Sequence, residues 1–87
     1  MRTVWKFTIA RVGEATRMLP EGAQFVAGRM GAYDTIDLWA EVDTEAERRD
    51  RRVRVYGTGH EQGDVDEFDH VATVFDGPFV WHVYVER

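Results

Sequence analysis

Two neighbouring groups of residues have the chemistry needed to bind an anion. The first is the run Gly57-Thr58-Gly59-His60, whose glycines let a backbone approach a ligand closely and whose successive N–H groups could form an anion nest. The second is an arginine pair just before it, because a planar guanidinium matches phosphate oxygens bidentately. The pattern predicts a site for a small anionic, nucleotide-like ligand, formed by Arg52, Arg54, Gly57, Thr58, Gly59 and His60.

A purely structural interpretation of these residues stays open beside the first. The phosphate-loop pattern G-x-x-x-x-G-K-[ST] is absent, and no long helix follows to contribute its dipole. Paired glycines at the end of a strand are common turn chemistry. The arginine-rich run over 48–54 precedes an acidic run over 61–69, and such charge runs are most often salt-bridged or solvated surface.

The second candidate is a protein interface. Several aromatic side chains fall on the faces of expected strands that do not form the core. Tyrosine and tryptophan are enriched in interface cores, because they bury a large area at a low cost in conformational entropy. The alternative is a core with two covered faces, as in a closed barrel. The candidate interface residues are Trp39, Tyr56, His82 and Tyr84.

The chain offers little for catalysis or metal binding. Serine and cysteine are absent, which excludes their nucleophilic triads, disulfide bonds and cysteine-ligated zinc. The acidic run does not match the EF-hand pattern, and no H-E-x-x-H motif is present. Three histidines, His60, His70 and His82, could act with carboxylates in acid–base pairs, but nothing in the sequence brings them together. We therefore expect no enzyme, no metal site and no cofactor.

Strands must position these candidates, because the dominant hydrophobic pattern alternates with a period of two. In the clearest case, Ile36, Leu38, Ala40 and Val42 share one face, and Asp37, Trp39 and Glu41 lie on the other. Clusters of glycine, proline and aspartate separate the alternating runs, as expected for turns. The pattern predicts six to seven short strands, at 5–9, 14–19, 24–30, 36–42, 52–58, 71–75 and 79–85.

One stretch, 43–49, has helical character. Asp43 could serve as its N-cap, and its acids come before its arginines, which suits the helix dipole. So short a segment does not persist without packing, so we expect at most one helical turn near 43–49. The predicted fold class is all-β: a small antiparallel barrel or sandwich, in a single domain over 1–87.

Composition restricts the function further. The 87 residues are 44% hydrophobic and 13% aromatic, which is enough for a packed core, and they carry a net charge of −5. A nucleic-acid-binding domain is usually basic, so this charge disfavours one. No apolar run approaches the ~20 residues of a membrane span, and the first residues lack an apolar signal core, so we expect a cytoplasmic protein. Exposed edge strands in so short a chain favour a homo-oligomer.

Several segments resemble a family of small bacteriophage proteins that has no assigned activity. The shared features are a turn at Leu19-Pro20-Glu21-Gly22-Ala23, a strand with Leu38-Trp39-Ala40, the Gly57-Thr58-Gly59-His60 element and a closing aromatic strand at Val80-Trp81-His82-Val83-Tyr84. The resemblance implies a phage or prophage product that acts inside a bacterial host. The leading hypothesis is a non-enzymatic accessory protein that binds a host protein and self-associates. The alternative is a protein that sequesters the small anionic ligand described above.

Overall fold

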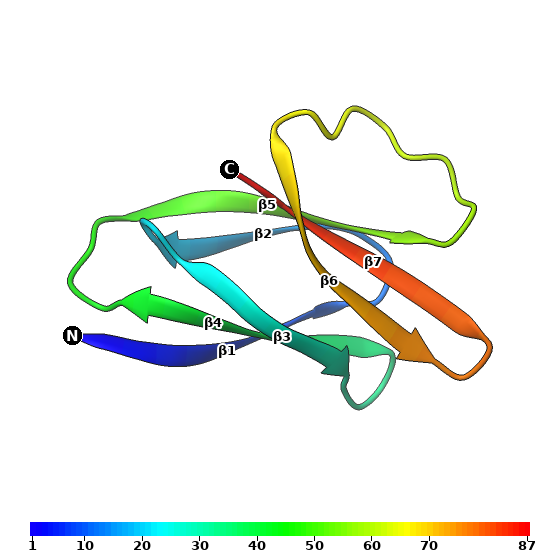
Figure 1. The fold of residues 1–87 in the computed structure, drawn as a ribbon, viewed down its shortest axis with the longest axis horizontal. Helices are drawn as coiled ribbons and strands as arrows, with labels where there is room; N and C mark the ends of the chain where they lie inside the picture. Colours follow the sequence, from blue (N-terminus) through cyan, green and yellow to red (C-terminus); the bar gives the residue numbers. More distant parts are fainter.

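The computed structural model describes residues 1–87 and contains seven β-strands and no helix (Figure 1). The all-β fold class expected from the sequence is therefore confirmed. No helix is present that could cross a membrane. The strands are β1 (Arg2–Ala10), β2 (Gly13–Pro20), β3 (Gln24–Met30), β4 (Thr35–Asp43), β5 (Arg48–Gly57), β6 (Phe68–Asp76) and β7 (Phe79–Glu86).

The strands form two antiparallel sheets that pack face to face. Sheet A has the order β1-β4-β3, and sheet B has the order β2-β5-β7-β6. Strands β3 and β6 cross closely at one side of the sandwich (Figure 1). A Cβ atom at Gly28 of β3 would lie 2.9 Å from the Cβ of Ala72 in β6, so only glycine fits there without a shift.

The core lies between the sheets and follows the alternation read from the sequence. Ile36, Leu38, Ala40 and Val42 of β4 are all buried against the inner side of sheet B. Burying a large aliphatic side chain stabilises the fold by roughly 1.5–3 kcal/mol, so the inner faces supply most of the stability. The main cluster consists of Ile9, Ile36, Leu38, Val53, Val55, Val74, Trp81, Val83 and Val85.

Strand β5 begins earlier than the pattern predicts, at Arg48 and not at residue 52. The preceding segment forms a tight turn and no helical turn. Asp43 accepts a hydrogen bond through Oδ1 from the Glu45 N–H at 3.0 Å, and its carbonyl accepts one from the Ala46 N–H at 3.1 Å. The chain thus reverses at once, and the arginines that follow enter the strand and pair with β2.

Strand β6 also begins earlier, at Phe68, and contains a bulge between His70 and Ala72. A bulge inserts one extra residue and resets the alternation of faces. As a result, Val74 is buried, whereas Thr73 and Phe75 point outward. His70 lies beside Tyr84 on the same outer side.

Candidate functional site

Both arginines predicted to bind an anion lie on the outer face of sheet B, and each is paired with a glutamate. Arg52 donates to Glu86 Oε2 from Nε at 3.2 Å and from Nη2 at 2.9 Å, and its backbone N–H donates to Glu86 Oε1 at 3.1 Å. Arg54 donates from Nε to Glu14 Oε2 at 2.7 Å and from Nη1 to the Asp64 carbonyl at 2.6 Å. A ligand anion at this position would compete with carboxylates already bound.

A buried ring holds these two arginines in place. The guanidinium carbon of Arg54 lies 4.4 Å from the ring centroid of Phe68, and that of Arg52 lies at 5.3 Å. The hydrogen bonds that the two arginines donate to the glutamates raise the pKa of both arginines, and the bonds from Arg52 lower the pKa of Glu86. The arrangement stabilises the charged forms within the protein itself.

The run Gly57-Thr58-Gly59-His60 forms the tight turn that ends β5. The Gly57 N–H donates to His60 Nδ1 at 3.2 Å, the Thr58 N–H to the Val80 carbonyl at 3.1 Å, and the His60 N–H to the Gly57 carbonyl at 3.0 Å. These N–H groups are therefore occupied and do not form an anion nest. Gly59 has a φ of +83°, which explains its identity through turn geometry.

Three of the four candidate interface residues come together on the outer face of sheet B. The rings of Tyr56 and Tyr84 meet edge to face with centroids 5.9 Å apart. His70 lies 5.3 Å from Tyr84 and 6.2 Å from His82 between ring centroids. We call these four residues, Tyr56, His70, His82 and Tyr84, the aromatic face. His70 was missing from the predicted interface because only the bulge in β6 aligns it with Tyr84.

Hydroxyl groups link the two imidazoles of the aromatic face. Thr73 Oγ1 lies 3.0 Å from His70 Nε2 and 3.2 Å from His82 Nδ1. Thr58 Oγ1 lies 2.7 Å from His82 Nε2. No carboxylate hydrogen-bonds to either ring, so the chain fixes ring orientation without the acidic partner that acid–base pairs commonly use. These contacts position the rings as a rigid surface.

The fourth candidate, Trp39, lies on the outer face of sheet A, on the far side of the sandwich. Its β4 register places it between Lys6 of β1 and Ala27 of β3. The Arg29 guanidinium carbon lies 5.3 Å from the Trp39 ring centroid. One partner surface therefore cannot contact Trp39 and the aromatic face together without wrapping around an edge.

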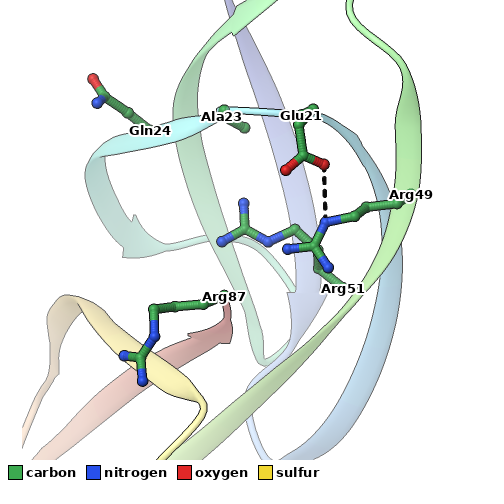
Figure 2. Close-up of a pocket in the computed structure, with 7 residues that line it drawn as sticks. Glu21, Ala23, Gln24, Arg49, Arg51 and Arg87 are labelled. Atoms are coloured by element: carbon green, nitrogen blue, oxygen red, sulfur yellow. Dashed lines mark ion pairs between the residues drawn. The ribbon is translucent and has the colours of Figure 1, made fainter.

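A different group of arginines surrounds a hollow of about 270 Å³ at one end of the sandwich. Figure 2 shows Arg49 and Arg51 reaching from β5 toward the space below Ala23, whereas Arg87, at the end of β7, turns its guanidinium away from them. Sequence reasoning placed Arg49 and Arg51 in the charge run but proposed no site for them. We call this hollow the arginine pocket; its lining includes Glu21, Ala23, Gln24, Arg49, Arg51 and Arg87.

A second hollow of about 240 Å³ adjoins the turn at the end of β5. His60 and Phe79 line it with Trp81, and the His60 ring meets Trp81 edge to face at 6.3 Å. No group of three or more histidine, cysteine, aspartate or glutamate side chains is placed to hold a metal ion.

The fold and these surfaces define a small all-β domain of two antiparallel sheets with one aromatic outer face and one arginine-lined hollow. The family model described as "Domain of unknown function (DUF7352)" matches residues 1–87, so the chain belongs to that family. This agrees with the expectation of a small family without an assigned activity. Comparison with curated proteins gave no match, and comparison with solved structures gave none either.

Proposed function

We propose that the protein is a non-catalytic binding protein and that its aromatic face contacts a partner protein. The observation that carries the proposal is the convergence of Tyr56, Tyr84, His70 and His82 on the exposed side of sheet B. Aromatic rings with polar tips are the side chains that interface cores favour. The rings are already oriented by one another and by two threonine hydroxyls, so less side-chain freedom is lost on binding.

Exposed apolar residues extend this surface toward the β6–β7 hairpin. Phe75 is 75% exposed on this side and pairs in register with Val80, whereas Phe79 lies on the other side of β7, stacked on Trp81. The outer side of sheet B thus changes along its strands from apolar, through aromatic, to the charged pairs around Phe68. Charged residues beside an exposed apolar patch are typical of interaction sites.

The proposal includes a biological setting and self-association. The resemblance to bacteriophage proteins supports a phage or prophage accessory role in the cytoplasm of a bacterial host, with a host protein as the partner. Self-association is supported by the sheet topology, in which each sheet ends in unpaired edge strands.

The small-anion alternative has less support at the residues predicted for it. Arg52 and Arg54 hold glutamates, and the N–H groups of Gly57, Thr58 and His60 are bonded within the protein. Anion binding there requires breaking an ion pair, which makes the aromatic face the better-supported function.

The proposal is tested by capture from bacterial lysate, followed by calorimetry with the purified partner. The variants are Tyr84→Ser and Phe75→Ser, and the matched control is Tyr33→Ser, because Tyr33 is 98% exposed on the β3–β4 hairpin. We expect binding to weaken by about tenfold or more in the two variants, as for central aromatic residues of interfaces, and to be unchanged in the control. A partner that binds all three variants with wild-type affinity would contradict the proposal.

Self-association is measured separately by analytical ultracentrifugation over a range of protein concentrations. We expect the average mass of the wild-type protein to rise with concentration. A constant monomer mass up to the highest concentration would remove this part of the proposal and leave partner binding to be judged by calorimetry.

A further inference from the structure

We propose that the arginine pocket binds a small phosphomonoester, such as a phosphorylated sugar. This goes beyond partner binding, because the pocket uses other residues and lies at the end of the sandwich where β5 begins and β7 ends. The inference rests on three observations: how the guanidinium groups are anchored, which of their donors are free, and what the lining lacks.

Arg49 and Arg51 are each held by a contact that leaves donors available. Arg51 donates from Nε to the Glu86 carbonyl at 2.6 Å, and its two terminal nitrogens have no partner in the protein. Arg49 Nε lies 3.0 Å from Glu21 Oε2, and its terminal nitrogens are also free (Figure 2). Arg87 borders the hollow but its guanidinium is engaged elsewhere: Nη1 donates to Asp69 Oδ1 at 2.6 Å and to the Phe68 carbonyl at 3.3 Å, and Nη2 donates to the Asp66 carbonyl. Anchored guanidiniums need little further ordering to bind an anion.

The lining has an excess of positive charge, which favours an anion. Arg87 is paired with Asp69, so Arg49 and Arg51 are left with one carboxylate, Glu21, and one positive charge in excess. Burial and, after it, the nearby positive charge of Arg49 lower the pKa of Arg51. A phosphomonoester carries about −1.5 to −2 at neutral pH and offers three acceptor oxygens, so it would meet both the excess positive charge and the free donors of Arg49 and Arg51.

Size and lining select the organic part of the ligand. A hollow of about 270 Å³ lies just below the usual range for small-molecule sites, ~300–1,000 Å³, so the ligand must be small. Ala23 is the single hydrophobic residue of the lining, and no aromatic ring faces the hollow. A nucleobase would therefore find nothing to stack on, whereas a polar sugar phosphate needs no such surface.

The test is isothermal titration calorimetry on the full chain at constant ionic strength. The probes are ribose 5-phosphate, inorganic phosphate, adenosine 5′-monophosphate and ribose. We expect binding of ribose 5-phosphate, weaker binding of inorganic phosphate, no gain from the adenine base, and no binding of ribose. The proposal is overturned if ribose 5-phosphate and inorganic phosphate release no more heat than sodium chloride does. It is also overturned if ribose binds without a phosphate.

Three substitutions locate the site. Arg51→Gln is expected to weaken ribose 5-phosphate binding by at least about tenfold, since it removes two free charged donors. Arg49→Gln, at an exposed position, is expected to weaken it as well and serves if Arg51→Gln does not fold. Arg54→Gln and the matched control Arg29→Gln are expected to bind like wild type. Wild-type affinity in both pocket variants, or an equal loss in Arg29→Gln, would overturn the proposal.

Discussion

Strand β5 carries two groups of arginines that are adjacent in the sequence but lie on opposite faces of the strand, in different environments. Arg52 and Arg54 lie on the outer face of sheet B, where glutamates of β7 and β2 hold them and raise their pKa. Arg51 lies on the other side of the same strand, where burial and Arg49 lower its pKa. Arginines on the outer side thus form ion pairs within the protein, whereas Arg51 on the inner side has no carboxylate partner.

A run of charged residues in a strand is divided between the two faces of the sheet, because its side chains alternate in direction. Over 48–54 the sequence shows one basic segment, but side chains of a strand point alternately to opposite faces. The outer arginines meet the acidic residues Glu14 and Glu86, and the inner ones meet only Glu21. Available donors, and not the number of arginines, separate a structural group from a candidate binding site.

The largest expected effect comes from removing the ring beneath the outer arginines. Phe68 is 7% exposed and lies under Arg52 and Arg54, so Phe68→Ala leaves a cavity and frees both guanidiniums. We expect a loss of about 3 kcal/mol in the free energy of unfolding, at the lower end for phenylalanine to alanine. Urea unfolding followed by circular dichroism measures it. A loss below about 1 kcal/mol would show that the outer group does not depend on this ring.

The turn at the end of β5 provides the next effect. A Cβ atom at Gly57 would lie 2.7 Å from the His60 ring, so Gly57→Ala forces the imidazole away from the backbone N–H that donates to it. Because the exposed His60 side chain can move aside, we expect a loss of about 0.5–1.5 kcal/mol, the contribution of the one hydrogen bond broken, measured by the same unfolding experiment. Gly59→Ala is the companion variant, since its φ of +83° predicts a loss from backbone strain without a steric contact. Unchanged stability in Gly57→Ala would contradict the assignment of this run as a closed turn.

The ion pair of Glu86 with Arg52 predicts a pH dependence. Arg52 lowers the pKa of Glu86 below its ordinary value of 4.5, so the folded state favours the carboxylate. This contribution to stability is complete above the pKa of the unfolded state and is lost as the pH falls through the lower folded value. We expect Glu86→Gln to reduce stability at neutral pH by less than Phe68→Ala, and to lose less stability than wild type in acid. Parallel curves of unfolding free energy against pH would refute this role for Glu86.

The smallest effect is expected on the inner side of the strand. Arg51→Gln removes a charge that Arg49 repels and keeps a side chain long enough to reach the neighbouring carbonyl of Glu86. We expect the free energy of unfolding to change by no more than about 0.5 kcal/mol, as for most surface substitutions. Chemical unfolding of Arg51→Gln beside Arg52→Gln measures the contrast directly. A larger loss in Arg51→Gln than in Arg52→Gln would reverse the comparison.

Much of the fold could be predicted because apolar residues alternate wherever a strand borders the core. Strand β4 follows its pattern from Ile36 to Val42, and β7 follows its own from Trp81 to Val85. The starts of β5 and β6 were not predictable in this way. The first residues of β5 are charged on both faces, and β6 begins with one buried ring, Phe68, followed by polar residues; hydrogen bonding to neighbouring strands, more than an alternating apolar pattern, makes these starts extended.

The candidate sites were predictable only as parts. Tyr56 is expected on the outer face of one strand and His82 on that of another, but sequence does not show that β5 and β7 are neighbours. His70 depends on a bulge that breaks the alternation. The arginine pocket joins Glu21, Arg51 and Arg87, which only the three-dimensional topology brings together.

The separation of β1 and β2 into different sheets has a consequence for how the chain folds. Strand β1 pairs with β4, so Arg2 finds its partner at Asp43, and β2 pairs with β5 across a similar gap in sequence. Only β3–β4 and β6–β7 join consecutive strands, and they lie in different sheets. Folding dominated by such distant pairing is slow, typically milliseconds to seconds. We expect the two hairpins to form first, so the N-terminal quarter of the chain waits for partners synthesised after it.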